Sequence, residues 1–348
     1  MESRKLRSAG PIRDDRVDIL GVGVSPINLD DAVATIERWI GERSRKYVCI
    51  TGVHGVMESR RNQRLRRIHN DAGMVTPDGM PLVWLSRFLG KRRTERVYGP
   101  DLMRKMTAVS SLRGYRQFYY GGAEGVADKL KQALITAHPK LDVVGTLCPP
   151  FRELMPEEDQ AVVAAINAAR PDIVWVGLST PKQEFWMANH LGRIEAPVII
   201  GVGAAFDFLA GAKRQAPLWM QRHGFEWLFR LCSEPRRLWR RYAYIVPGFT
   251  ILAVGEFLRR AIRSSSAARG VWHTSEHGWK PERRSRNVEP EFEMRPANGG
   301  GGPGRVAGSI CVREDDARRD NGVAGQWPAL RLGKVANARD GAGGSGGG

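Results

Sequence analysis

The amino-acid sequence predicts an α/β fold with a doubly wound, mostly parallel, Rossmann-like sheet. Two apolar runs rich in β-branched residues, 172–178 and 196–202, have the length and composition of buried parallel strands. Each run ends in a loop of small residues that leads into a helical pattern, and about seven such strands alternate with helices. Ligands of open α/β sheets bind at the carboxyl edge, so we expect the functional residues in these loops.

Composition divides the 348 residues, 42% of them hydrophobic, into four expected segments. They are a flexible N-terminus (1–16), the α/β core (17–214), a basic amphipathic appendage (215–264) and a disordered glycine-rich tail (265–348). The first residues lack the apolar run of a secretory signal, which favours a cytoplasmic protein. The four cysteines are far apart and have no metal-ligand spacing, so we expect no metal site.

The first strand is expected at 17–24 and the first helix at 29–41, with Asn28 or Asp30 as its N-cap. The strand carries a Gly-x-Gly pattern, but a proline follows and no third glycine opens a helix. A nicotinamide-dependent oxidoreductase needs the full glycine motif and is therefore disfavoured.

The second expected strand, 46–51, ends in Thr51 at the carboxyl edge, where its hydroxyl can contact a substrate. His54 follows on the next loop, before a basic helix at 57–69. The imidazole of His54 either binds a ligand or only belongs to the start of that helix, and the sequence leaves both interpretations open.

A short strand at 74–79 ends in a Pro-Asp-Gly triplet, and a helix is expected at 81–89. An aspartate between proline and glycine is typical of a turn. The same carboxylate, Asp78, would also lie on a loop beside any ligand at the sheet edge. There it could accept a proton from an attacking hydroxyl group.

The segment 91–101 is basic and polar, and a helix is expected from about residue 102 with Asp101 as its N-cap. Arg96 in this segment is either a solvated side chain or a phosphate ligand that uses paired N–H donors. The remaining expected elements between this segment and the second half of the core are a strand at 141–147 and a helix at 157–169.

Glycine turns follow two expected strands. Gly121 and Gly122 end the strand 117–122, and the backbone N–H groups of such a turn suit phosphate binding. Gly203 follows the run 196–202, where the missing side chain lets a ligand or another backbone approach closely. Such turns also occur without a ligand, so both interpretations stay open.

Several blocks of sequence, in a fixed order and spacing, belong together. They are Pro181-Lys182-Gln183-Glu184, Gly201 to Gly211, Ala216-Pro217 with Trp219-Met220-Gln221-Arg222, Glu226-Trp227-Leu228, and Glu234-Pro235-Arg236-Arg237. Together they resemble the signature of the WecG/TagA/CpsF family of bacterial glycosyltransferases. The resemblance covers roughly residues 18–241 and leaves the tail outside it.

The resemblance implies roles for residues already singled out. Asp78 matches the aspartate proposed as the catalytic base of the family. Thr51 lies where the family often has Thr-x-Asn; the asparagine is absent here, and His54 is the residue that can compensate for it. Arg96 and Asp101 match an Arg-x-x-Gly-x-Asp pattern, in which the arginine would hold a diphosphate or an acceptor phosphate.

Two neighbouring residues at the start of an expected helix complete the candidate site. The family position of Gln183 implies contact with a uracil or sugar edge. Lys182 either contacts phosphate or is an ordinary surface lysine.

The appendage is helical in pattern, basic and interleaved with aromatic residues, which favours an anionic membrane surface over nucleic acid, with an ordinary solvated face as the other alternative. Its most apolar part, 242–258, is short for a membrane span and is interrupted by Pro-Gly. We expect it to lie on the membrane, with a single transmembrane helix as the alternative. The resemblance implies that such an appendage also closes the site with arginines, for which Arg222, Arg230 and Arg237 are the candidates.

The sequence and the resemblance together predict an inverting glycosyltransferase without metal or cofactor, peripheral on the cytoplasmic face of the plasma membrane. It would move N-acetylmannosamine, its uronic acid or glucose from a UDP-sugar to a lipid-pyrophosphate-linked acceptor in polysaccharide assembly. No Asp-x-Asp pair lies in the expected loops, so cationic groups would neutralise the leaving group. The alternative is a non-catalytic nucleotide-sugar-binding or scaffold protein, and a homo-oligomer remains open in either case.

Overall fold

The structure, a computed structural model, describes residues 15–270, and for residues 260–270 it describes the backbone alone. The chain divides into two units, and the core described below, up to residue 263, belongs to the first. The expected flexible N-terminus up to residue 14 and the expected tail from residue 271 lie outside the described residues.

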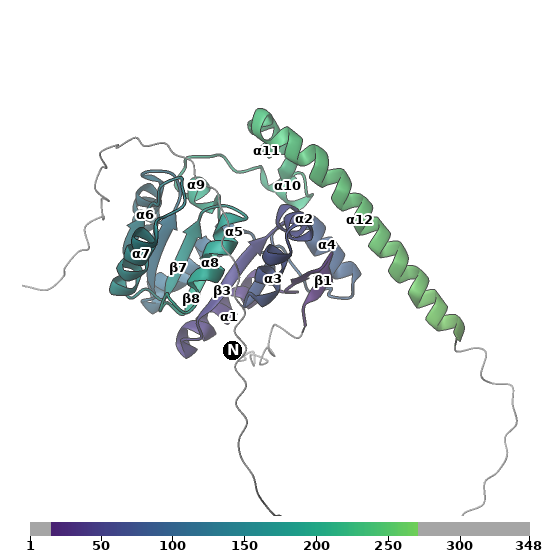
Figure 1. The fold of residues 1–348 in the computed structure, drawn as a ribbon, viewed down its shortest axis with the longest axis horizontal. Helices are drawn as coiled ribbons and strands as arrows, with labels where there is room; N and C mark the ends of the chain where they lie inside the picture. The colour runs from purple at the N-terminus through teal and green to yellow at the C-terminus, as the bar shows by residue number, and fades with distance from the viewer. Residues whose placement is uncertain (1–14, 271–348) are drawn as a thin grey trace, which may run out of the picture. The chain divides into compact units, whose positions relative to one another are not determined.

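Six strands form the main sheet in the order β4-β3-β8-β7-β5-β6, and every neighbouring pair is parallel (Figure 1). They are β3 (Lys46–Thr51), β4 (Met74–Pro77), β5 (Arg116–Gly121), β6 (Asp142–Leu147), β7 (Ile173–Gly177) and β8 (Val198–Gly201). The expected α/β class and the parallel sheet are confirmed.

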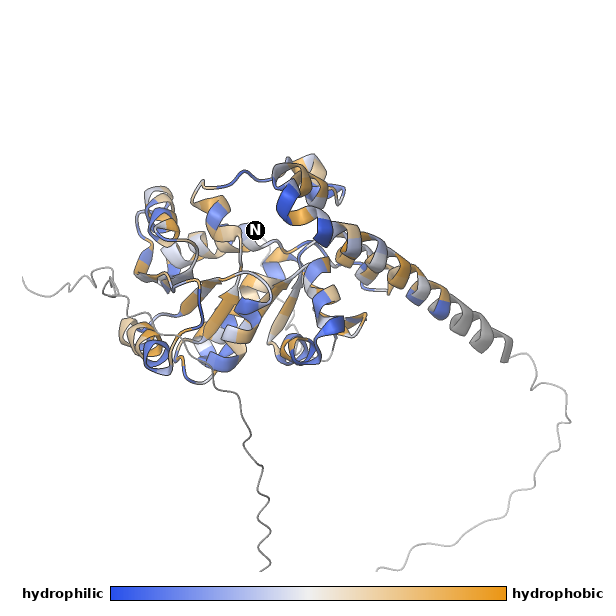
Figure 2. Cartoon of the chain, turned by 45° about the horizontal axis from the view of Figure 1, so that its top comes forward, coloured by the Kyte–Doolittle hydropathy of each residue, from blue (hydrophilic) through white to orange (hydrophobic). Residues whose placement is uncertain are grey.

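Helices cover both faces of this sheet. One face packs against α1 (Leu29–Glu42), α5 (Gly99–Arg113), α6 (Val126–Ala137) and α9 (Ala205–Leu209). The other face packs against α2 (Val53–Arg61), α3 (Gln63–Asp71), α4 (Met80–Phe88), α7 (Pro156–Ala169) and α8 (Lys182–His190). The alternation is clear in β3, where Val48 and Ile50 enter the first core, and Tyr47 and Cys49 the second. The strands are accordingly the most hydrophobic elements in Figure 2.

A crevice is expected where neighbouring strands send their connections to opposite faces. β3 leads into α2 on one face, and the adjacent β8 leads into α9 on the other. Their carboxyl-end loops therefore diverge, which is the arrangement in which open α/β sheets bind ligands.

The prediction of a single strand at residues 17–24 is wrong. Residues 17–24 form an antiparallel hairpin of β1 (Val17–Ile19) and β2 (Val22–Val24), separate from the main sheet. Leu20 and Gly21 make the turn with φ of 54° and 90°, the positive values that a tight hairpin turn requires. The Gly-x-Gly pattern is therefore part of a hairpin and opens no helix.

Two helix starts also differ from expectation. The single helix expected at 57–69 is split at Asn62, whose side chain accepts the N–H of Leu65 and caps α3. Helix α5 begins at Gly99, so Asp101 lies in its first turn and is not its N-cap. Asn28, by contrast, does cap α1, through a capping box with Asp31.

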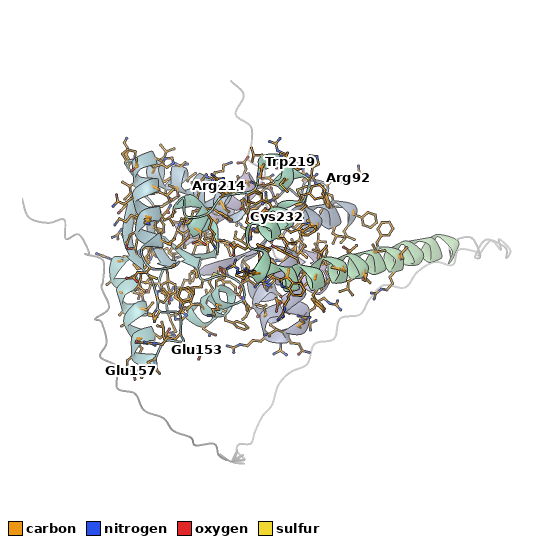
Figure 3. The ribbon with its side chains drawn as sticks, turned by 90° about the horizontal axis from the view of Figure 1, so that it is seen from above. Arg92, Glu153, Glu157, Arg214, Trp219 and Cys232 are labelled. Carbon is orange, nitrogen blue, oxygen red and sulfur yellow. The ribbon has the colours of Figure 1, made fainter. Side chains whose placement is uncertain are left out.

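The appendage consists of α10 (Leu218–Arg222), α11 (Glu226–Ser233) and α12 (Pro235–Gly270). Pro247 lies inside α12, which continues through it where we expected an interruption. Ile245 and Phe249 of α12 are buried in the core on the side of α2, whereas residues such as Trp219, labelled in Figure 3, are exposed. Within residues 15–270, no helix combines the length and apolarity that a membrane crossing needs.

Candidate active site

The ends of β3 and β4 place Thr51 and Asp78 side by side. The backbone N–H of Asp78 donates a hydrogen bond of 2.9 Å to the carbonyl oxygen of Thr51. The hydroxyl group of Thr51 is buried and has no hydrogen-bond partner in the protein. Because unpaired buried hydroxyl groups are costly, this oxygen is a candidate contact for a ligand.

The Asp78 carboxyl group lies in a partly buried site of mixed charge. Burial raises its pKa to about 6, opposed by Arg96 and Arg230 and assisted by Glu226 and Asp101. A carboxylate with a pKa near neutral is a stronger base than a solvated aspartate and is still ionised at pH 7. The geometry and this pKa suit proton transfer at the sheet edge.

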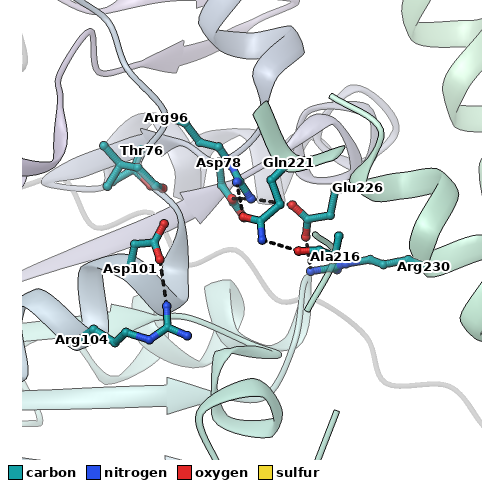
Figure 4. A network of polar contacts seen from close by, with 10 residues as sticks. Thr76, Asp78, Arg96, Asp101, Arg104, Ala216, Gln221, Glu226 and Arg230 are labelled. Carbon is teal, nitrogen blue, oxygen red and sulfur yellow. Dashed lines mark hydrogen bonds and ion pairs between the residues drawn. The ribbon is translucent and has the colours of Figure 1, made fainter. Parts of the chain in front are cut away.

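Arg96 lies at the centre of a polar network that joins the core to the appendage (Figure 4). Its guanidinium group donates to Gln221 Oε1 at 2.8 Å and to Glu226 Oε2 at 2.5 Å, and it stacks over the ring of Tyr98 at 4.0 Å. The nearest Asp78 oxygen is 3.9 Å away. Glu226 also pairs with Arg230, one turn later in α11, at 2.9 Å.

A second polar group lies where β7 and β8 end. Glu184 Oε1 accepts from the Thr180 hydroxyl at 2.8 Å and from Gln183 Nε2 at 3.2 Å. These bonds leave Gln183 Oε1 buried and without a partner, 3.3 Å from where a side chain at Gly203 would begin. Burial raises the pKa of Glu184. The free acceptor of Gln183 matches a ligand that donates an N–H or O–H group.

The glycines at the end of β5 have a structural explanation. A Cβ at Gly121 would lie 2.8 Å from the backbone of Gly177 on β7, and both Gly121 and Gly122 have positive φ. The close approach of the two strands therefore requires Gly121 even without a ligand. Phosphate binding at this turn stays a prediction.

Other expected site residues lie outside the Arg96 network. Asp101 pairs with Arg104 at 2.9 Å, and Arg237 pairs with Glu234 at 2.6 Å. Burial, together with Arg241, lowers the pKa of His54 to about 4. Two further residues are exposed, Lys182 at the start of α8 and Arg222 at the end of α10. Ligand contacts for these residues stay predictions.

Sequence reasoning missed the roles of Gln221, Glu226 and Tyr98. Gln221 and Glu226 stood inside recognised blocks, but the pattern of an amphipathic helix does not say which core residue it meets. Tyr98 lies two residues after Arg96, a spacing compatible with the stacking that is observed. Among residues 15–270, no group of three or more His, Cys, Asp or Glu side chains is arranged to hold a metal ion.

Comparison with known proteins identifies the family of this chain. Residues 17–263 match the profile described as the glycosyl transferase WecG/TagA/CpsF family. The chain belongs to this family. It is therefore a glycosyltransferase, and the match includes the hairpin, the core and the appendage as far as residue 263 of α12.

Two relatives are enzymes named N-acetylglucosaminyldiphosphoundecaprenol N-acetyl-beta-D-mannosaminyltransferase. The one from Bacillus spizizenii is 29% identical over 184 residues, which is 53% of this chain and 69% of that enzyme. The one from Staphylococcus aureus is 26% identical over 227 residues, which is 65% of this chain and 87% of that enzyme. These relatives make a non-catalytic scaffold the weaker alternative for this glycosyltransferase.

Proposed function

We propose that this glycosyltransferase moves N-acetylmannosamine from its UDP derivative to a lipid-diphosphate-linked N-acetylglucosamine, with inversion at the anomeric carbon. Of the three donor sugars that the sequence left open, the names of the relatives favour N-acetylmannosamine. The observation that carries the mechanism is Asp78, a partly buried carboxylate whose pKa is raised to about 6 at the carboxyl edge of the sheet.

Asp78 acts as the general base in this proposal. It takes the proton of the acceptor hydroxyl group while that oxygen attacks the anomeric carbon. The new glycosidic C–O bond forms as the bond to the diphosphate oxygen breaks, and UDP leaves with the electron pair. The proton remains on Asp78 until solvent removes it. Attack from the face opposite the leaving group inverts the anomeric configuration.

The cations beside Asp78 stabilise the leaving group. Arg96 is largely buried, with 13% of its side chain exposed, and Arg230 approaches the same carboxylate, Glu226. Guanidinium groups in a partly buried site offer paired N–H donors to phosphate oxygens. Lys182, at the exposed start of α8, is a third cation for this role. We propose that these groups suffice without a divalent metal.

Gln183 and Thr51 are the proposed contacts of the donor. Each presents a buried oxygen that has no partner in the protein. The Gln183 carbonyl oxygen, held by Glu184, would accept the N–H of the uracil ring. β8 is the neighbour of β3 in the sheet, and the Gln183 side chain lies beside Gly201 and Gly203 at the end of β8, which supports a single donor site for both residues.

The appendage is the proposed membrane-binding part of this glycosyltransferase, on the cytoplasmic face. Several of its large apolar side chains are exposed, among them Trp239, Tyr244 and Ile251 at 53%, 50% and 71%. Exposed aromatic and aliphatic groups among arginines suit the interface of an anionic bilayer. Such a position would bring the active site to an acceptor whose lipid remains in the membrane.

The test is release of UDP in the presence of the lipid-linked acceptor, with a panel of UDP-sugars. We expect UDP-N-acetylmannosamine to be used, full activity in EDTA, and no activity in Asp78→Asn, whose UDP-sugar binding is retained. An Asp78→Asn enzyme that works at the wild-type rate would remove Asp78 as the base. Complete dependence on added Mg²⁺ or Mn²⁺ would contradict the metal-free mechanism.

A further inference from the structure

The guanidinium group of Arg96 faces three side chains, and the two that belong to the appendage lie closest to it (Figure 4). Gln221 Oε1 lies 2.8 Å and Glu226 Oε2 2.5 Å from its nitrogens, both on the appendage. Asp78 Oδ1 lies 3.9 Å away, which is too far for a hydrogen bond. The appendage thus holds Arg96 away from the Asp78 carboxylate, which Arg96 could otherwise bind.

The distance between Arg96 and Asp78 matters because a carboxylate paired with a guanidinium group is a weak base. A carboxylate in a bidentate pair with arginine has its lone pairs occupied and its pKa lowered. Asp78 escapes this pairing, although its side chain and that of Arg96 are in the same partly buried site. Glu226 makes the shortest contact with Arg96, so it is the acidic side chain that competes most directly with Asp78 for the guanidinium group.

We propose that Glu226 is a positioning residue of the active site: by holding Arg96 on the appendage, it keeps the Asp78 carboxylate free to accept a proton. The inference rests on the proposed role of Asp78 as the base. It gives the appendage a part in the chemistry besides membrane binding, because the base is free only while α11 lies against the core.

When Glu226 is neutralised, its lost charge and the two arginines that it releases both lower the pKa of Asp78. The residues that influence it are Arg96, Tyr98, Asp101, Glu226 and Arg230. Loss of the Glu226 charge removes a neighbour that raises the pKa of Asp78. It also releases both arginines toward Asp78, which lowers that pKa further. Asp101 keeps its partner Arg104.

The test is the pH dependence of transfer by full-length Glu226→Gln. We expect the acid limb of the kcat profile to move down by about one pH unit, as a closer guanidinium group predicts. We also expect kcat to fall several-fold at the optimum, because a weaker base transfers the proton more slowly. The matched control is Glu234→Gln, since Glu234 pairs with Arg237 and Lys213 and does not contact Arg96.

Two results would overturn the inference. A slower Glu226→Gln enzyme with an unmoved acid limb would mean that Glu226 only fastens the appendage, and wild-type behaviour would mean that it has no role. If Glu226→Gln fails to fold, Gln221→Leu removes the other appendage acceptor and should move the limb in the same direction by less. An unmoved limb in that variant would refute the inference.

Failure of this inference can be told apart from failure of the proposed function. If Asp78→Asn transfers the sugar at full rate, the base is wrong and Glu226 has nothing to position. If Asp78→Asn is inactive and Glu226→Gln leaves the acid limb in place, the base stands and only the role of Glu226 is lost.

Discussion

The backbone N–H of Asp78 is bonded to the carbonyl oxygen of Thr51 at 2.9 Å, so the ends of two parallel strands hold the candidate base. Gly52 follows Thr51 and lies against the backbone of Asp78. A Cβ at Gly52 would meet the carbonyl oxygen of Asp78 at 2.9 Å, closer than Cβ atoms normally approach. The position of the carboxylate therefore depends on a residue without a side chain.

We expect Gly52→Ala to lose activity while the protein stays folded. The added methyl group would displace the Asp78 loop, and a shift of about 1 Å near the chemistry can cost on the order of 100-fold in rate. The measurement is kcat/KM together with a thermal melt. Gly41→Ala is the control, because a Cβ there has nothing within 4 Å and alanine favours a helix. Equal activity in both variants would show that the loop tolerates the methyl group.

Asp78→Asn should abolish transfer and, at the same time, stabilise the folded protein. The pKa of Asp78 is raised from 3.8 to about 6 in the fold, so its ionisation destabilises the folded state progressively between these two values and fully above about pH 6. We expect asparagine to raise the free energy of unfolding by on the order of 2 kcal/mol at pH 8. The difference should nearly vanish below about pH 3, where the carboxyl group is protonated in both states. Denaturant unfolding at the two pH values measures it, and a difference independent of pH would contradict the raised pKa.

The same pKa predicts the acid limb of activity. Transfer needs the carboxylate, so we expect kcat/KM of the wild-type enzyme to fall as the pH drops below about 6. His54 cannot account for this limb, because its pKa is lowered to about 4. A His54→Gln variant is the control and should keep the limb in place. A limb that disappears in His54→Gln would transfer the assignment to histidine.

Sequence alone could predict much of the core site, because parallel strands bring their ends to one edge. Thr51, Asp78 and Gln183 all follow apolar runs, and each lies at the carboxyl edge of its strand or at the helix start beyond it. The error at residues 17–24 had a local cause: apolar side chains alternate on both sides of the Leu20-Gly21 turn, so the hairpin looked like one strand. The prediction of Asp101 as the N-cap of α5 is wrong because the helix begins two residues earlier, at Gly99, and Pro100 already belongs to its first turn.

The appendage contacts could not be predicted in this way. Glu226 and Arg96 are 130 residues apart, and no periodic pattern connects them. An amphipathic helix indicates that one face is covered, without naming the partner. Only the folded chain shows that a charged residue of α11 meets the arginine beside Asp78.

Gln183→Leu should weaken donor binding and leave the fold intact or slightly more stable. Leucine removes the buried, unpaired carbonyl oxygen of Gln183, which favours the fold, and the bond from Gln183 Nε2 to Glu184, whose oxygen keeps the bond from Thr180. We expect the Kd for UDP to rise by about tenfold or more, the cost of about one lost hydrogen bond from a buried site. Calorimetric titration with UDP and a thermal melt measure the two effects.

Gln117→Leu is the matched control for that substitution. Gln117 is equally buried, but its amide donates to Ser110 and accepts from Tyr119 and Trp175 at 2.9 to 3.0 Å. Leucine there should destabilise the fold by several kcal/mol, because three partners lose a bond of about 1 kcal/mol or more each. UDP affinity of the folded fraction should not change. Loss of affinity in both variants would mean that Gln183 acts through the fold and not as a contact.

Charge reversal on the appendage should abolish binding to anionic vesicles. Arg236 and Arg240 are exposed on α12, near the exposed ring of Trp239. Each basic residue near an anionic bilayer contributes about 1 kcal/mol to binding. Reversing both arginines to glutamate changes the charge by about 4 units, so binding should weaken by about 100-fold or more.

The control is the double variant Lys129→Glu with Lys140→Glu, because these exposed lysines lie in or after α6 on the core and change the net charge equally. Sedimentation with phosphatidylglycerol vesicles at low and high salt measures binding. Equal loss in both double variants would attribute the attraction to net charge, and unchanged sedimentation of the appendage variant would refute the proposed membrane surface.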